Sequence, residues 1–177
     1  MSGIIGSVGS KSGIVGSNVY PDGHVIRVST YEIGQGTNTT NSFPEDNTIP
    51  QRSEGTEVFS QAYTPSESNV DLIIEFDIQI VEVTNVVYAV AVGLFISDDV
   101  DALRVCDDNN GDAGYSLNNS NFSTSHKMAS WGKTAKTFSL RSGGGAAYNL
   151  GAEYVSSRTQ IYGVSRKTLF KIWEVVS

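Results

Sequence analysis

The sequence contains a single cysteine, only two histidines and few basic residues. Cys106 has no partner in the chain, so an intrachain disulfide is excluded, and a lone cysteine is most often a small buried apolar group. The 12 Lys and Arg residues stand against 19 Asp and Glu residues, which gives a formal charge of −7. Nucleic acid binding requires clustered positive charge, so we expect no nucleic-acid partner.

Long apolar runs and targeting signals are also missing. The longest apolar run covers about eleven residues, whereas a helix that crosses a membrane needs ~20. The first residues carry neither the basic region nor the continuous apolar region of a signal peptide. We therefore expect no membrane insertion and a protein that is made in a cytoplasm.

Residue types that carry chemistry occur without the spacing that a catalytic or metal site requires. His24 and His126 stand in no recognisable catalytic context. Calcium prefers about six to eight oxygen ligands, and the calcium-loop motif fails because Cys106 would occupy the first ligand position and Leu117 the closing one. The acidic residues that make this region the best metal candidate are Asp98, Asp99, Asp101, Asp107, Asp108 and Asp112. The sequence thus predicts no catalytic residue, no cofactor and no metal, with calcium in this loop left open.

Three other patterns have a functional and a plainer interpretation. A glycan hydrolase needs a carboxylate pair in a cleft, but Glu75 and Asp77 fit the solvated face of a strand. The glycine run at residues 142–145 lacks the lysine and helix of a phosphate-binding loop, so we expect a turn. Large aromatic side chains are more often core or interface residues than sugar-binding ones. The aromatic residues that could contact a glycan are Trp131, Tyr148, Tyr154, Tyr162 and Trp173.

Alternating apolar and polar residues at positions 70–80 predict a long β-strand with one buried face. Residues 86–96 are apolar at every position, which indicates a strand covered on both faces. The centre of a sandwich or a contact between subunits would cover the second face, and loops of the same chain are the alternative. The residues expected at this subunit interface are Val86, Tyr88, Val90, Val92 and Leu94.

Further strands are expected at residues 24–33, 57–64, 102–106, 136–141, 146–155, 159–164 and 167–176. Residues 34–55 and 107–127 are polar and are expected to be loops. Eight or nine short strands without a convincing helix are typical of an all-β, jelly-roll-like antiparallel β-sandwich. We assign this domain to residues 21–177.

Residues 1–20 form a separate segment that contains a repeat. Two pairs of β-branched residues are each bracketed by glycines, and such a segment has too little apolar surface to fold by itself. It can become ordered by adding to a sheet edge or a groove on a partner, and a frayed leader is the alternative. The residues of this predicted docking arm are Gly3, Ile4, Ile5, Gly6, Gly13, Ile14, Val15 and Gly16.

Several of these motifs resemble virion proteins of marine tailed bacteriophages. The two glycine-bracketed pairs, joined by Ser10-Lys11-Ser12, resemble the leader of such proteins. Residues 62–65 before the long strand, residues 138–141 with their glycine run, and residues 168–174 at the end resemble their trimeric jelly-roll heads. Residues 34–55 and 107–131 have no counterpart in this resemblance.

The resemblance implies a non-enzymatic structural protein of the virion, assembled in the host cytoplasm as a homotrimer. As a capsid decoration (cement) protein, it would contact the major capsid protein through its N-terminal arm. As a tail fibre or fibre tip, it would contact tail proteins through the arm. Its loops would then bind a host receptor, such as a surface glycan. The resemblance favours decoration, because no shaft repeat separates arm and head.

Overall fold

The computed structural model describes residues 20–33, 38–39, 43–44, 46–82, 89–109, 119–144, 148–150 and 168–177. Every regular element in these ranges is a β-strand, so the described residues contain no helix that could span a membrane. The predicted all-β class is confirmed. The strands are β1 (Val25–Ile33), β2 (Asn38–Thr39), β3 (Thr56–Tyr63), β4 (Val70–Glu82), β5 (Ala89–Ile96), β6 (Arg104–Asn109), β7 (Asn119–Ala129), β8 (Lys136–Gly144), β9 (Tyr148–Leu150) and β10 (Thr168–Val176).

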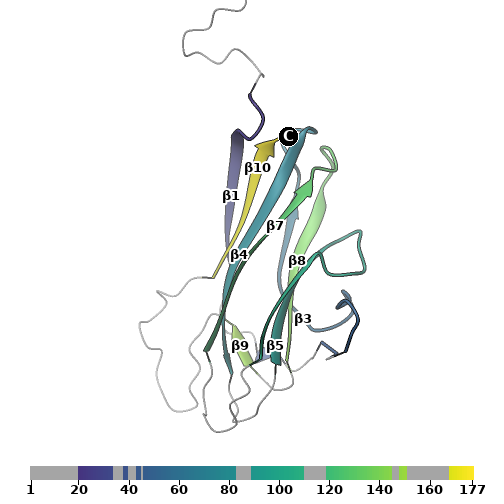
Figure 1. Cartoon of the computed structure of the whole chain (residues 1–177), viewed down its shortest axis with the longest axis vertical. Coiled ribbons are helices and arrows are strands. Elements are labelled where there is room, and N and C mark those ends of the chain that lie inside the picture. Colours follow the sequence, from purple (N-terminus) through teal and green to yellow (C-terminus); the bar gives the residue numbers. More distant parts are fainter. Residues whose placement is uncertain are drawn as a thin grey trace, which may run out of the picture.

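The strands form two antiparallel sheets that pack as a jelly-roll-like sandwich (Figure 1). The larger sheet has the order β1-β10-β4-β9-β2, and β7 pairs with β4. The smaller sheet has the order β3-β8-β5-β6. The consecutive strands β4 and β5 therefore lie in different sheets. The C-terminus lies at the same end of the sandwich as the start of β1.

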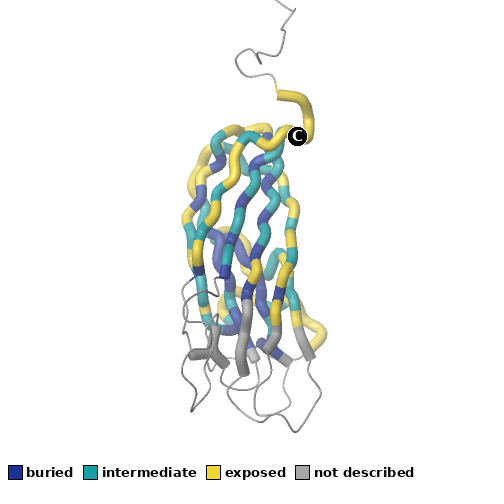
Figure 2. The backbone as a smooth tube through the Cα atoms, turned by 90° about the vertical axis from the view of Figure 1, so that its left-hand side faces the viewer, coloured by how far each residue is buried: buried dark blue, intermediate teal, exposed yellow. Residues whose placement is uncertain are grey.

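The core follows from the alternation along β4. Leu72, Ile74, Phe76 and Ile78 are all at most 2% exposed and point between the sheets, while the residues between them face outward. The buried and exposed positions alternate along the strands in Figure 2. Aromatic rings fill the middle of the sandwich, where the ring centroids of Phe59 and Phe170 lie 4.8 Å apart. The predicted buried face of this strand is thus confirmed.

Strand β5 is covered on both faces, and its inner face belongs to the core of the same chain. Val90, Val92 and Leu94 are 2%, 0% and 0% exposed and pack in the cluster between the two sheets. These three side chains are therefore core residues, which corrects their predicted place in a subunit contact. Val86 and Tyr88, the other two predicted interface residues, lie outside the described part of the chain.

The outer face of the smaller sheet is covered by the segment around Phe43. The Phe43 ring packs against Phe95 at 6.4 Å between centroids, and Phe43 is 7% exposed. Three glycines on β8, on β5 and just before β3 make room for this ring. A Cβ atom at Gly55 would lie 2.8 Å from the Phe43 ring, and one at Gly143 would lie 2.9 Å from it. A loop of the same chain thus supplies the cover that the apolar sequence of β5 requires.

Hydrogen bonds fix this covering segment at several points. Arg141 donates from Nε to the Glu54 carbonyl at 2.7 Å and from Nη2 to the Gly55 carbonyl at 2.9 Å. Arg52 donates a guanidinium hydrogen bond to the Ser97 carbonyl, and its backbone N–H donates to Val100 at 2.7 Å. The polar composition of residues 34–55 predicted a surface loop, and residues 46–55 do lie at the surface. The segment that contains Phe43 also covers the outer face of the smaller sheet.

Two predictions of local structure are wrong. Residues 107–127 were expected to form a polar loop, but residues 119–127 belong to β7, which pairs with β4 along eleven positions. The glycine run was expected to be a turn, yet residues 142–144 continue β8, and Ser142 is 0% exposed. Glycine is normally disfavoured in a strand because it packs no side chain. Here the missing side chain at Gly143 admits Phe43.

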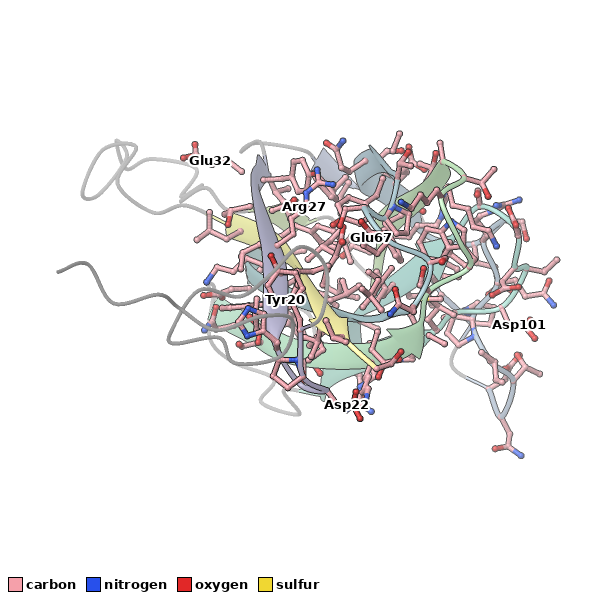
Figure 3. The ribbon with its side chains drawn as sticks, turned by 90° about the horizontal axis from the view of Figure 1, so that it is seen from above. Tyr20, Asp22, Arg27, Glu32, Glu67 and Asp101 are labelled. Atoms are coloured by element: carbon pink, nitrogen blue, oxygen red, sulfur yellow. The ribbon has the colours of Figure 1, made fainter. Side chains whose placement is uncertain are left out.

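Residues 1–19 of the predicted arm (residues 1–20) lie outside the described residues, but the point of attachment is described. A turn at residues 21–24 precedes β1, with Gly23 at a φ of 81°. The Gly23 N–H donates to the Val176 carbonyl at 2.8 Å, and the Val176 N–H donates to His24 at 2.9 Å. Figure 3 looks along the sandwich from this end, where Tyr20 lies beside β1. The chain therefore enters the sandwich next to the C-terminal strand.

Candidate functional site

The outer face of the larger sheet carries polar side chains in ordered rows. Register pairing aligns β1, β10, β4 and β7 across this face, so that residues of four strands stand side by side. The residues of one row are Thr30, Lys171, Glu75 and Ser125, and those of the next row are Glu32, Leu169, Asp77 and Ser123. The predicted solvated face of residues 70–80 is therefore the floor of a polar surface built by several strands.

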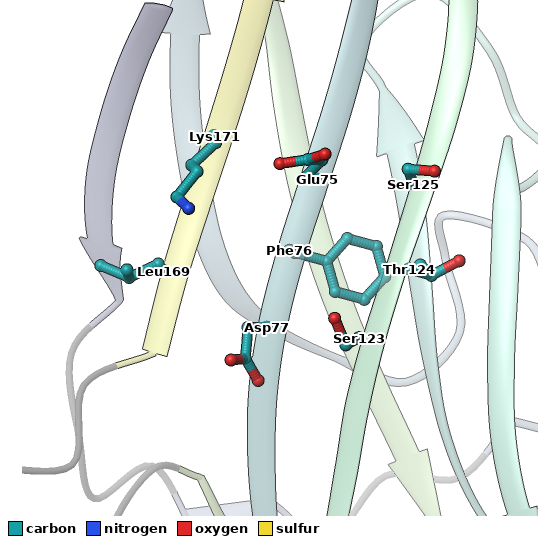
Figure 4. A pocket seen from close by; sticks show the side chains of 8 residues that line it. All are labelled: Glu75, Phe76, Asp77, Ser123, Thr124, Ser125, Leu169 and Lys171. Carbon is teal, nitrogen blue, oxygen red and sulfur yellow. The ribbon is translucent and has the colours of Figure 1, made fainter.

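A pocket of about 420 Å³ lies on this face, across β10, β4 and β7 (Figure 4). Two carboxylates, one ammonium group, two serine hydroxyls and one leucine point into it, while the side chains of Phe76 and Thr124 face the core. The lining residues are Glu75, Phe76, Asp77, Ser123, Thr124, Ser125, Leu169 and Lys171. Small-molecule sites in proteins have volumes of about 300–1,000 Å³. The pocket is therefore large enough for a small polar ligand.

Trp173 fixes one of the two carboxylates. Its indole Nε1–H donates to Glu75 Oε2 at 2.9 Å, so the other carboxylate oxygen remains available as an acceptor. Asp77 and Lys171 form no hydrogen bond or ion pair with any residue that the structure describes. The sequence placed Glu75 and Asp77 on a solvated strand face but predicted no site there, because only the strand register brings Lys171 on β10 and the serines on β7 beside β4.

The two tryptophans that were candidates for a glycan-binding surface lie in different parts of the sandwich. Trp131 packs edge-on against the core ring of Phe138 at 5.7 Å, and its indole N–H donates to the Thr134 carbonyl at 2.8 Å. The Lys136 ammonium group lies over the Trp131 ring, 5.2 Å from the ring centroid. Trp173 lies on the outer face instead. The Tyr148 side chain, Tyr154 and Tyr162 are outside the described part of the structure.

The histidines do not form a pair. His24 stacks on Tyr20 at the start of β1, with 4.7 Å between ring centroids. His126 lies on β7, and β10 and β4 separate these two strands in the sheet. Burial lowers the pKa of His126 below its ordinary value, and the positive charge of Arg104 lowers it further.

The acidic residues after position 97 are used separately. Asp98 forms an ion pair with Lys136 at 2.7 Å, and the hydrogen bond from Lys136 lowers the pKa of this carboxyl. The backbone of Asp101 pairs with that of Gln51 in the covering segment as an isolated antiparallel β-bridge. Within the described residues, no three His, Cys, Asp or Glu side chains come together as metal ligands. The Asp108 side chain and Asp112 are outside those residues.

Among the acidic residues that the structure describes, Glu174 is the most buried, at 0% exposed near the arm end of β10. Its carboxylate accepts hydrogen bonds from the Tyr63 hydroxyl at 2.6 Å, from the Ser66 N–H at 3.0 Å and from the Ser66 hydroxyl. Arg27 lies 3.6 Å away and stacks over the Tyr63 ring. Burial raises the pKa of the Tyr63 phenol above its ordinary value, and the hydrogen bond to Glu174 adds to this shift. This group joins β1, β3 and β10, and is a structural clamp.

Comparisons with known proteins give only distant structural matches. No model of a protein family matches the sequence, and no curated protein matches it. Among solved structures, that of infectious bursal disease virus Gx strain aligns with 97% of this chain and 47% of its own, at 11% identity and a TM-score of 0.34. The Gt strain structure aligns with 98% and 43%, at 14% identity and a TM-score of 0.31. The virus's VP2 subviral particle aligns with 98% and 43%, at 12% identity and a TM-score of 0.28. The chain thus spans less than half the length of these proteins.

Proposed function

We propose that this chain is a non-enzymatic structural protein of a bacteriophage virion, most specifically a trimeric capsid decoration protein anchored by its N-terminal arm. The observation that carries the proposal is that described residues of one chain cover both faces of β5. The core cluster packs against the inner face of this strand, and Phe43 packs against Phe95 on its outer face. We therefore infer that the two apolar pairs in the sequence of the arm bind a partner.

The point where the arm joins the sandwich supports docking through that end of the sandwich. The turn at residues 21–24 is hydrogen-bonded to the C-terminal strand, so the arm starts from a fixed point. Burying four β-branched side chains contributes roughly 6–12 kcal/mol, and ordering the residues around them costs ~1–2 kcal/mol each. A single arm is therefore a marginal anchor. Three arms on a trimer would bind cooperatively through their high effective concentration.

The trimer is proposed to form through the edge of the larger sheet near the arm. Val25 and Val28 on β1 are 42% and 47% exposed, and their neighbours on β10 are Val175 and Trp173. This apolar edge replaces the contact that the sequence predicted on β5. A neighbouring subunit would also cover the free edge of β1, which open sheets otherwise leave available for pairing.

Deletion of residues 2–17 tests the arm. We expect the shortened protein to remain a folded trimer in sedimentation velocity but to be absent from particles. A second variant that replaces Ile4, Ile5, Ile14 and Val15 with serine keeps the length and should behave in the same way, whereas Lys11→Gln should be incorporated normally. Incorporation of either arm variant at the normal copy number would refute the docking arm, and a monomer in sedimentation would refute the trimer.

A tail fibre or fibre tip is the second candidate, and the pocket on β10, β4 and β7 is the observation that favours it. A receptor-binding protein needs an exposed ligand site, and this pocket lies on an open sheet face (Figure 4). Electron microscopy of the particle distinguishes the two roles. Density on the shell supports decoration, and density on the tail supports the fibre.

A further inference from the structure

We propose that the pocket on the outer face of the larger sheet binds a neutral hexopyranose unit of a glycan. This inference goes beyond the structural role in the virion. It depends neither on the point of arm attachment nor on the oligomeric state, because one chain supplies all the lining residues.

The hydrogen-bonding groups of the pocket match the hydroxyls of a sugar. Glu75 and Asp77 are two positions apart on one strand, which places their acceptors about 7 Å apart on the same face. Lys171 on one side donates, and Ser123 and Ser125 on the other side both donate and accept. A pyranose ring presents hydroxyls, which also donate and accept, around its rim. Acceptors in the centre with donors on both sides can therefore bind hydroxyls from opposite edges of one ring.

The pocket is also preorganised. All its lining side chains are on strands, which hold a binding group more precisely than loops do. The indole of Trp173 holds Glu75 in place at 2.9 Å. Asp77 and Lys171 are without a hydrogen-bonding partner within the described residues, so a ligand would not have to displace one. Leu169 offers an apolar contact for the C–H face of a sugar.

Charge decides which glycans fit. Two carboxylates and one ammonium group line the pocket, and the whole chain has a formal charge of −7. Acidic sugars and phosphates would be repelled by this surface. The described residues also offer no group of three metal ligands, so an ion-bridged sugar is not what the pocket is built for. A neutral sugar satisfies the carboxylates through its hydroxyls without bringing another negative charge.

The test uses the full-length protein and the methyl glycosides of glucose, galactose and mannose as probes. Saturation-transfer NMR and calorimetry should detect saturable binding of at least one of them. Asp77→Asn and Glu75→Gln should each weaken that binding about tenfold or more, because a charged acceptor is lost. Glu57→Gln is the matched control, since it removes the same charge from β3 of the other sheet. It should leave binding unchanged, and circular dichroism should confirm the fold of each variant.

The following results would count against the inference. If none of the three glycosides binds, or if binding persists in both pocket variants, the pocket is not a sugar site. Tighter binding of sialyllactose than of the neutral glycosides would contradict the charge argument. Ser125→Ala, which leaves every charge in place, should weaken binding severalfold, and an unchanged affinity would count against the assigned contacts. Cleavage of a glycoside bond would instead refute the non-enzymatic assignment while leaving a sugar site in place.

Discussion

Substitution of Phe43 by alanine tests whether one chain seals its own apolar layer. Phe43 is 7% exposed, and its ring fills the space above Gly55, Gly93 and Gly143 against Phe95. Without this ring, the Phe95 side chain and the backbone at Gly55, Gly93 and Gly143 would be exposed to water. The substitution therefore removes buried area from two partners at once.

The magnitude follows from the burial of the ring. Removing a buried phenylalanine side chain costs about 3–5 kcal/mol in a closed core. Phe43 covers the outer face of the smaller sheet, and residues 46–55 can partly collapse into the space that its ring would leave. We therefore expect the free energy of unfolding to fall by about 2–4 kcal/mol. Ile49→Ala is the matched control, because Ile49 belongs to the same segment but is 57% exposed. It should change stability by less than about 0.5 kcal/mol.

Equilibrium unfolding in urea measures both variants, at one fixed protein concentration because the proposed trimer would make stability concentration-dependent. Binding of a hydrophobic dye should rise for Phe43→Ala and not for Ile49→Ala, since only the first exposes Phe95. Equal stabilities of Phe43→Ala and the unmodified protein would refute the reasoning. The outer face of the smaller sheet would then be covered by something other than this segment.

Two further predictions concern buried polar groups. Glu174→Gln should lower the free energy of unfolding by about 1–3 kcal/mol in the same assay, because it weakens the hydrogen bonds to Tyr63 and Ser66 in a site that is 0% exposed. Glu67→Gln, which breaks an exposed ion pair with Lys133, should cost less than about 0.5 kcal/mol, and an equal effect of both would argue against the clamp. The lowered pKa of His126 means that the unfolded chain binds a proton more readily than the folded one, so stability should fall as the pH drops below about 6.5. His126→Gln should lose that part of the pH dependence, and an NMR titration midpoint for His126 at or above about 6.5 would contradict the assignment.

The sequence by itself determined the fold class and the faces of the main strands. Period-two alternation is enough to find β4, because its inward residues are large and apolar and its outward residues are polar. The structure shows the same alternation along β10, where Phe170 and Ile172 are buried and Leu169 and Trp173 lie on the outer face. The alternation rule failed for β7, because the inward residues Thr124 and His126 are polar, as are the outward residues Ser123 and Ser125. No continuous hydrophobic period therefore marks the strand. That strand is held by its pairing with β4 and not by its own pattern.

Only the tertiary structure decided what covers β5 and what stands beside Glu75. An apolar strand reports that both its faces are dry, but it does not report whether a subunit or a loop keeps them dry. The answer depends on Phe43 and on glycines at positions 55, 93 and 143, which no local pattern connects. The pocket depends in the same way on register, because Lys171, Glu75 and Ser125 are neighbours only through hydrogen bonding between strands distant in sequence. Local patterns are set by neighbouring residues, whereas covers and sites are set by long-range pairing.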